Sequence, residues 1–212
     1  MTVLKGKPIN KEFFSIKAFI CNLSEYNKGN LAGFWHIFPT HKKSLLNKLK
    51  KININEKCTD ELFITDYESD IRILRKYLGE YENLNELNYL AHKICSLKSY
   101  DMVKFISAIE FGEYCSSIEE IINLTDNLDC FDYIDNVHNL EDLAYIIVED
   151  YGLIDAKQLG ELARYFDYES FGRDFSINEG GMFTKNGYIY LNGEQFMNIY
   201  NGKNMPDIYR VV

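Results

Sequence analysis

The sequence predicts an α+β fold, arranged as an elongated chain of three small domains. Segments rich in Phe, Ile and Tyr lie towards both ends of the chain, and segments with apolar residues at helical spacing occupy its middle. The 212 residues are 46% hydrophobic and 15% aromatic, which excludes intrinsic disorder as the main state. A chain of this length and composition can bury a core in each of several small domains.

The first domain is expected to hold an antiparallel sheet and one helix. Residues 1–12 are expected to form a loose leader, and the domain itself is expected to span residues 13–72. We expect strands at 13–23 and 31–38, because the turn residues Gly29 and Asn30 lie between them. Thr40 is expected to N-cap a basic helix over 41–51, and residues 62–67 to form a third strand.

The second domain, residues 73–126, is expected to be a helical bundle. Asn83 or Asn85 caps a segment whose leucines and isoleucines recur at helical spacing, and Asp101 opens a second helix. Ser117 and Glu120 have the spacing of a capping box, which predicts a third helix through about Thr125.

The third domain, residues 127–212, is expected to mix helices and strands. Short aromatic strands are predicted at 130–134, 182–183 and 188–190. Asn139 is expected to cap a helix that ends at Gly152, and Asp155 to open another helix through about Phe166.

Charge is distributed very unevenly along the chain. The net charge is −9, but residues 1–57 carry +8, residues 58–100 carry −3 and residues 101–212 carry −14. From Phe105 to Ala156 there is no lysine or arginine, although apolar residues recur throughout. A folded surface of one sign repels itself, and a strongly basic partner is the natural reason to tolerate this. The thirteen carboxylates of this segment are Glu110, Glu113, Glu119, Glu120, Asp126, Asp129, Asp132, Asp135, Glu141, Asp142, Glu149, Asp150 and Asp155.

These carboxylates have a spacing that suits imitation of a polyanion. Duplex DNA presents one negative charge per ~1.7 Å of its axis. Carboxylates three or four residues apart on a helix lie ~5–6 Å apart, near the separation of adjacent phosphates on one strand. A row of acids without cations therefore predicts a DNA-like surface, and the alternative is a solvated acidic face.

Motifs for catalysis, cofactor binding or metal binding were sought without success. The sequence has no phosphate-binding loop, no dinucleotide fingerprint and no zinc spacing among its four histidines and five cysteines. The acids recurring from Asp126 to Asp135 lack the glycine and the bidentate glutamate of a calcium loop. No apolar run approaches the ~20 residues of a membrane span, so we expect a cytoplasmic protein. It is expected to be neither an enzyme nor a cofactor protein.

Four segments resemble the ArdA antirestriction proteins and keep their order over roughly residues 13–192. Residues 19–35 resemble the pattern NL..YN.G.L.G.W, and residues 63–68 resemble I.DYE. Residues 81–88 are similar to the helix start EY.S..ELN, and residues 165–174 are similar to Y.DY.AYGRD, the most specific of the four.

The resemblance implies a non-enzymatic DNA mimic encoded on plasmids and conjugative transposons. Such a protein blocks the DNA-binding groove in the methyltransferase core of type I restriction–modification enzymes, and it thereby spares incoming DNA. The resemblance also implies an elongated homodimer that pairs through its C-terminal domain, without cofactor and without binding DNA itself. The acids of residues 105–156 are then the mimic surface. Tyr165, Phe166, Tyr168 and Phe171 are expected in dimer or core packing.

The basic N-terminal domain departs from this family pattern. Lys42, Lys43, Lys48, Lys50 and Lys51 lie on or near one predicted helix, where a full-length mimic should be acidic. The basic face could be simply solvated, could point away from the target, or could contact nucleic acid or another partner. Two rival functions also stay open. One is an acidic adaptor for another basic protein, such as a nucleoid or conjugation factor, and the other is a hydrolase with paired carboxylates.

Overall fold

The computed structural model describes residues 15–54, 61–152 and 160–212. It has an α+β fold with two small antiparallel sheets, as the sequence predicts. The chain forms two compact units, and each of them is assembled from separated segments. Unit 1 comprises residues 1–102, 114–126 and 197–212, and unit 2 comprises residues 103–113 and 127–196. The division into three domains stays a prediction.

The sheet of unit 1 has the strand order β2-β1-β3 and confirms the three predicted strands. The loop between β1 and β2 holds a short helix, α1, that the sequence analysis did not predict; Asn22 caps it by accepting a hydrogen bond from the Glu25 N–H. Gly29 has a φ of 84°, which explains the glycine at this turn. The bounds are β1 (Ile16–Asn22), α1 (Leu23–Asn27), β2 (Gly33–Phe38) and β3 (Leu62–Ser69).

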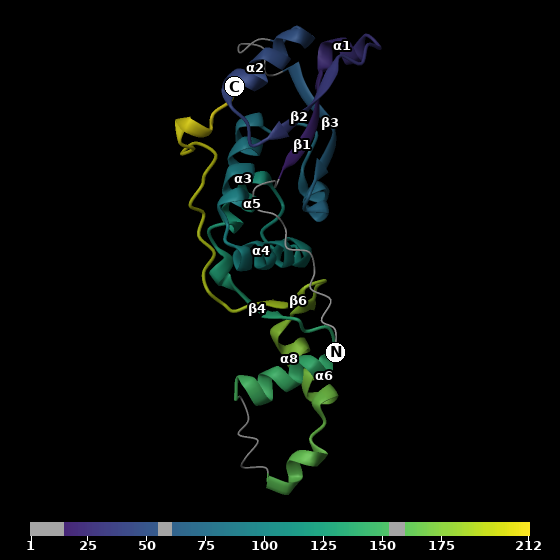
Figure 1. Cartoon of the computed structure of the whole chain (residues 1–212), viewed down its shortest axis with the longest axis vertical. Coiled ribbons are helices and arrows are strands. Elements are labelled where there is room, and N and C mark those ends of the chain that lie inside the picture. The colour runs from purple at the N-terminus through teal and green to yellow at the C-terminus, as the bar shows by residue number, and fades with distance from the viewer. Residues whose placement is uncertain (1–14, 55–60, 153–159) are drawn as a thin grey trace. The chain divides into compact units, whose positions relative to one another are not determined.

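Alternation along the strands separates the two faces of this sheet. Ile16, Ala18 and Ile20 of β1 point into the core, as do His36 and Phe38 of β2. The other face is more open, and α3 (Leu84–Ser96) lies on one side of the sheet in Figure 1. The sheet and α3 thus form two layers of unit 1.

The predicted basic helix is present as α2 (Lys42–Leu49) and continues as the 3-10 helix η2 (Lys50–Ile52). Its predicted cap was wrong. His41 occupies the N-cap position without a side-chain cap bond, and the Thr40 N–H donates to Asn88 Oδ1 of α3 at 2.7 Å. The helix thus begins one residue later than predicted, and the Thr40 backbone is bound to α3.

The helices α3 and α5 (Ile118–Leu124) begin at the predicted caps Asn83 and Ser117. The Ser117 hydroxyl accepts from the Glu120 N–H at 3.2 Å. The return bond to the Glu120 carboxylate comes from the Ser116 N–H at 2.8 Å, one residue earlier than a standard capping box requires. Helix α4 (Ser99–Phe111) begins two residues before the predicted Asp101, and its residues are divided between the two units.

The C-terminal segment of unit 1 runs past α5 and α3 (Figure 1) and is attached through buried asparagines. Asn123 of α5 accepts from the Tyr200 N–H at 2.7 Å and donates to the Tyr200 carbonyl at 2.8 Å. Asn88 donates to the Tyr209 carbonyl at 2.9 Å. Buried amides with several partners hold an otherwise irregular segment in one position.

Unit 2 has a sheet of order β4-β6-β5 packed against helices, and it confirms the predicted short strands. Asn139 caps α6 as predicted, since its Oδ1 accepts from the Asp142 N–H at 2.8 Å. The helix continues into a π-helical turn, η6. The bounds are β4 (Phe131–Asp135), α6 (Leu140–Tyr145), η6 (Ile146–Asp150), β5 (Met182–Phe183) and β6 (Gly187–Leu191).

Helix α8 (Tyr168–Glu179) was not predicted and packs on α6. Asp167 caps it by accepting from the Ser170 N–H and hydroxyl. Gly172 lies so close to the Leu140 backbone that a side chain would have no room there. The helix predicted from Asp155 begins outside the described residues, which resume with the 3-10 helix η7 (Gly160–Tyr165). Within the described ranges, every helix is too short or too polar to cross a bilayer.

Candidate acidic surface

Most of the acidic segment belongs to unit 2, so the negative charge of the chain is concentrated in that unit. In the sequence, unit 2 has sixteen carboxylates against five lysines and arginines, a net of −11, whereas unit 1 has sixteen against eighteen, a net of +2. The net charge of −9 therefore arises entirely from unit 2.

The fold keeps the predicted acids at the surface. Of the thirteen, Asp155 lies outside the described residues and none of the other twelve is buried. Glu110, Glu119 and Glu120 are half-buried, and the other nine are exposed. Glu119, Glu120 and Asp126 belong to unit 1.

Strand β4 holds two of these acids at the surface. Its residues Phe131, Tyr133 and Ile134 are buried, whereas Asp132 and Asp135 are exposed. β4 is an edge strand, so charges here also discourage pairing with another sheet. Asn192 Nδ2 donates to Asp132 Oδ1 at 3.2 Å, and Asn136 Nδ2 donates to Asp135 Oδ2 at 2.9 Å.

The helical acids of unit 2 lie on α6 and η6. Glu141 and Asp142 occupy the first turn of α6, where carboxylates interact favourably with the helix dipole. The Asn139 side chain donates to Asp142 at 2.8 Å, and the Tyr168 hydroxyl donates to Glu149 at 2.6 Å. The bond to Glu149 is the main reason that the pKa of Tyr168 is raised. These contacts fix the orientation of carboxylates that would otherwise move freely.

One predicted acid has a cationic partner that the sequence analysis missed. Lys93 of α3 forms an ion pair with Asp126, and their side chains are 19% and 31% exposed. The partner comes from outside the cation-free segment, 33 residues away in sequence. No spacing rule could have indicated it, because the contact depends on how α3 packs against α5.

The four aromatic residues predicted for dimer or core packing lie in two environments. Phe171 packs against the core of unit 2, and Phe166 contacts Tyr168 and Phe171 at ring separations of 4.8 and 5.5 Å. Tyr165 is 72% exposed, with the Arg164 guanidinium 5.0 Å from its ring centre. Core packing thus accounts for Phe171 and leaves Tyr165 available for a partner.

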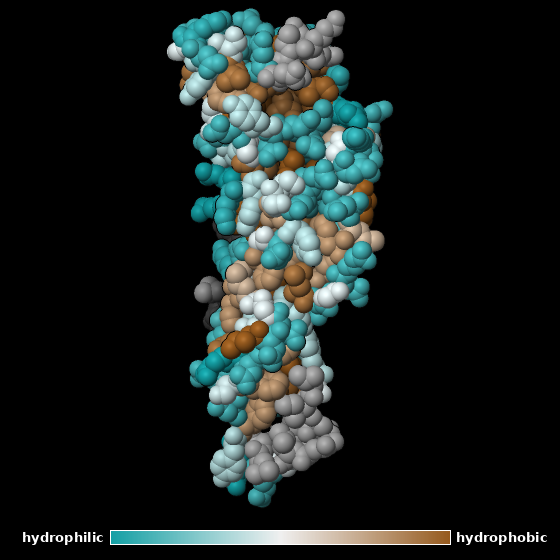
Figure 2. Space-filling view, turned by 180° about the vertical axis from the view of Figure 1, so that it is seen from behind, coloured by the Kyte–Doolittle hydropathy of each residue, from teal (hydrophilic) through white to brown (hydrophobic). Residues whose placement is uncertain are grey.

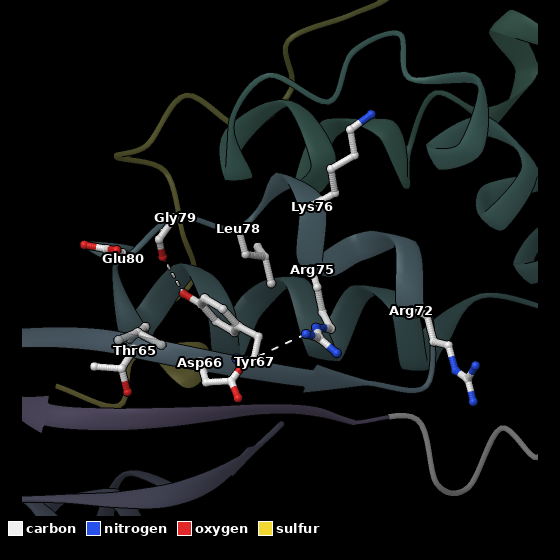
Figure 3. Close-up of a pocket in the computed structure, with 10 residues that line it drawn as sticks. Thr65, Asp66, Tyr67, Arg72, Arg75, Lys76, Leu78, Gly79 and Glu80 are labelled. Carbon is white, nitrogen blue, oxygen red and sulfur yellow. Dashed lines mark hydrogen bonds and ion pairs between the residues drawn. The ribbon is translucent and has the colours of Figure 1, made fainter.

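A pocket of about 420 Å³ lies in unit 1 between β3 and the 3-10 helix η4 (Arg72–Tyr77), and Figure 3 shows its lining. The Tyr67 hydroxyl donates to the Gly79 carbonyl at 2.8 Å, and Arg75 lies 3.9 Å from Asp66. The Lys76 side chain extends away from both (Figure 3). The charged groups do not converge on a common point, as a ligand site would require. Nor do the described residues contain three or more His, Cys, Asp or Glu grouped to hold a metal ion.

The fold and its exposed carboxylates define an acidic α+β protein whose candidate site is a charged surface. A scan against family models matches residues 18–190 to the family described as antirestriction protein (ArdA), so the chain belongs to the ArdA family. Membership implies an antirestriction function and interaction with restriction enzymes in general. A search of curated proteins gave no match.

Proposed function

We propose that this protein imitates B-form DNA and blocks the DNA-binding groove of type I restriction–modification enzymes. It acts in the cytoplasm of a recipient cell and protects the DNA of an incoming plasmid or conjugative transposon. Its target is the methyltransferase core, and no chemical step or cofactor is involved. The acids predicted from the sequence occupy the positions of phosphates in that groove.

One observation carries the proposal. All twelve described acids of residues 105–156 are at least partly exposed, and the segment contributes no lysine or arginine to its own surface. Ordinary solvated surfaces mix the two signs, because mixing lowers the self-repulsion. A groove built for duplex DNA meets one charge per ~1.7 Å, and any cation within the row would weaken the match.

The acids of unit 2 also have the rigidity that imitation requires. Asp132, Asp142 and Glu149 each accept a hydrogen bond from a side chain of the same unit. Ordering them on binding therefore costs less conformational entropy than ordering free side chains. A rigid acidic surface also avoids the energy that bending real DNA demands.

We further propose that the protein forms a homodimer through its C-terminal part. Tyr165, at 72% exposed, and Ile177, at 70%, are large apolar side chains of unit 2 that lack cover within the described chain. Tyrosine is enriched in interfaces. Sedimentation velocity of the wild type and of Tyr165→Lys tests this part: the variant is expected to shift towards monomer, and an unchanged dimer would exclude Tyr165 from the interface.

The main experiment is cleavage of unmodified plasmid by a type I enzyme, with this protein added near enzyme stoichiometry. Inhibition that is relieved by excess non-specific DNA is the expected result. Reversal of Glu141, Asp142, Glu149 and Asp150 to lysine should abolish inhibition. A matched variant reverses Glu61, Glu80, Glu179 and Glu194, which are exposed but lie outside the acidic segment, and it should keep most of the activity.

Both quadruple variants have the same net charge. Equal loss of inhibition in the two variants would therefore show an effect of net charge alone and would contradict the proposal. Single neutralisations should be nearly silent, because one exposed pair contributes only ~0.2–1 kcal/mol. If one neutralisation removed all inhibition, distributed mimicry would be excluded. If this protein bound another basic protein and DNA did not displace it from that partner, we would conclude that it is an acidic adaptor and not a DNA mimic.

A further inference from the structure

Tyr145 is an exposed aromatic residue in the middle of the acids of α6 and η6. Its side chain is 55% exposed. Glu141 lies four residues before it on α6, and Glu149 lies four residues after it on η6; both are exposed, whereas Ala144 and Ile147 are buried. Residues four apart on a helix are neighbours on its surface. The outward side of this helix therefore presents an aromatic ring between carboxylates.

Tyr168 of α8 brings a second ring to the same place. The ring centres of Tyr145 and Tyr168 are 6.0 Å apart, and their planes are tilted by 37°. Phe166 meets the Tyr168 ring edge to face at 4.8 Å and supports it. The Tyr168 hydroxyl donates to Glu149 Oε1 at 2.6 Å, which places this carboxylate beside the rings. Contacts between α6, η6 and α8 thus bring two rings and a carboxylate together within unit 2.

These two rings have no cation of their own. Within the described chain, no lysine or arginine lies over the ring of Tyr145 or Tyr168, whereas the Arg164 guanidinium lies 5.0 Å from the centre of the Tyr165 ring. Residues 105–156 contain no lysine or arginine. The face of an aromatic ring is electrostatically negative. Rings and carboxylates here therefore add to one uncompensated negative site.

Exposure of hydrophobic groups is not in itself unusual on this protein. Figure 2 shows one face of the molecule, on which hydrophobic residues occur among hydrophilic ones. Single exposed apolar side chains need no special explanation. Tyr145 differs because acids are its neighbours along the helix and because its ring contacts that of Tyr168. A ring in this setting attracts a cation, which an aliphatic side chain of the same size would not do.

We propose that Tyr145, Tyr168, Glu141 and Glu149 form a binding site for the guanidinium group of an arginine side chain on the partner protein. A guanidinium group is planar, stacks on aromatic rings and binds a carboxylate through two parallel hydrogen bonds. The ammonium group of lysine is compact and strongly hydrated, so it gains less from the rings. This inference rests on the proposed function for the identity of the partner, since arginine commonly binds phosphate and guanine in DNA-binding grooves.

The direct test uses the full-length protein without a restriction enzyme. Fluorescein-labelled hexa-arginine and hexa-lysine peptides carry equal charge. Their binding is measured by anisotropy in about 0.15 M salt, which screens attraction between distant exposed charges. The wild type should bind hexa-arginine more tightly than hexa-lysine. In Tyr145→Leu the affinity for hexa-arginine should fall about threefold to tenfold, while the affinity for hexa-lysine should stay within about twofold of the wild type.

Two further variants show whether the aromatic ring is the cause. Tyr145→Phe keeps the ring without its hydroxyl and should bind both peptides like the wild type. Tyr81→Leu is the matched control, because Tyr81 is 69% exposed and lies between Glu80 and Glu82 but has no second ring beside it in the described chain. It should leave both affinities within about twofold. Tyr145→Leu should fold normally, since the side chain is exposed and leucine is a good helix former.

Equal losses for the two peptides in Tyr145→Leu would overturn the proposal, because they would show no preference of the site for guanidinium. A loss in Tyr145→Phe as large as in Tyr145→Leu would also overturn it, since the ring is then not what binds. The same holds if Tyr81→Leu lost as much hexa-arginine binding as Tyr145→Leu, because any exposed tyrosine near acids would then serve.

Inhibition of plasmid cleavage by a type I enzyme shows whether the site serves the proposed function. Tyr145→Leu should require about threefold to tenfold more protein for half inhibition, and Tyr145→Phe should match the wild type. If the wild type did not inhibit, the proposed function would fail, whereas a selective loss of hexa-arginine binding would still support the site. If the wild type inhibited but Tyr145→Leu kept the full preference for hexa-arginine, the guanidinium site would be overturned and the proposed function would stand.

Discussion

His36 is a buried histidine without a polar partner, and this makes the stability of unit 1 depend on pH. It is 2% exposed, and within the described chain neither ring nitrogen has a hydrogen-bond partner. The rings of Phe34 and Phe38 meet it edge-on, at 6.1 and 5.2 Å. Burial, with a smaller contribution from the Lys48 charge, lowers the pKa of His36 to about 4.

The size of the effect follows from linkage. An unfolded histidine has a pKa of about 6.5. Between pH 6.5 and pH 4, His36 is therefore protonated in the unfolded chain but neutral in the folded protein. Stability therefore falls as pH decreases through this window, because the unfolded state binds more protons. The free energy of unfolding should drop by about 2 kcal/mol from pH 7 to pH 5, and by about 3 kcal/mol in total below pH 4.

The assay is urea unfolding at pH 7 and pH 5, followed by the fluorescence of Trp35, the adjacent residue on β2. In His36→Leu the pH-dependent loss should shrink by about 2 kcal/mol relative to the wild type. At pH 7 the variant should be at least as stable as the wild type, because a buried polar group without a partner has been removed.

The loss of unfolding free energy between pH 7 and pH 5 is compared between the variant and the wild type. This comparison removes the contribution of the other groups that titrate in the same range. Glu86 and His92 of unit 1 have shifted pKa values as well, but they are present in both proteins. A second variant, His138→Asn, alters an exposed histidine of unit 2 and should retain the full pH dependence of the wild type. If His36→Leu lost as much stability between pH 7 and pH 5 as the wild type, burial of a neutral imidazole would not be the cause of the pH dependence.

Three further changes test the packing and the acidic surface. Asn123→Ala should destabilise unit 1 by about 3 kcal/mol in urea unfolding, because both backbone groups of Tyr200 lose a buried partner. Gly172→Ala should cost unit 2 about 1–3 kcal/mol in the same assay, since the added methyl group must displace the backbone of α6; an equal or higher stability would contradict the close helix contact. Asp126→Asn should leave inhibition of plasmid cleavage within about twofold of the wild type, because Lys93 already compensates that charge.

Local chemistry explains why much of the fold could be predicted. The caps Ser117 and Asn139 were predicted, and Asn83 was one of two candidates, because a cap bond joins residues two or three positions apart. The strands were identified from runs of aromatic and β-branched residues between turn residues. Such a pattern is local and can be recognised without knowing the rest of the molecule.

Helix α8 is an element that local sequence patterns did not predict. Its sequence contains Gly172, Ser170 and several aromatic residues, which are weak helix formers. The helix is specified instead by its contact with α6, where only a glycine fits, and by Phe171 and Phe175 against the core. Thr40 also makes a contact that the local sequence could not show, because its N–H donates to Asn88, 48 residues away.

For the candidate surface, the sequence identified which residues are acidic but not what each of them contacts. The absence of cations from residues 105–156 is visible in the sequence, whereas the pairs Lys93–Asp126 and Tyr168–Glu149 exist only after folding. Nor could the sequence show that the charge divides between two units built from separated segments. The almost complete burial of His36 likewise becomes visible only in the folded chain.

The acids of unit 2 differ from a merely solvated face in how they are held. A solvated carboxylate gains little from a fixed orientation, since water satisfies its oxygens in any rotamer. Asn139, Asn192 and Tyr168 nevertheless donate hydrogen bonds to Asp142, Asp132 and Glu149. These neutral donors orient each charge without cancelling it, whereas a lysine or arginine would do both. These neutral donors restrict the carboxylates, and the lack of lysine and arginine in residues 105–156 preserves their charge. The combination supports the proposed imitation of a rigid polyanion more strongly than the count of acids alone.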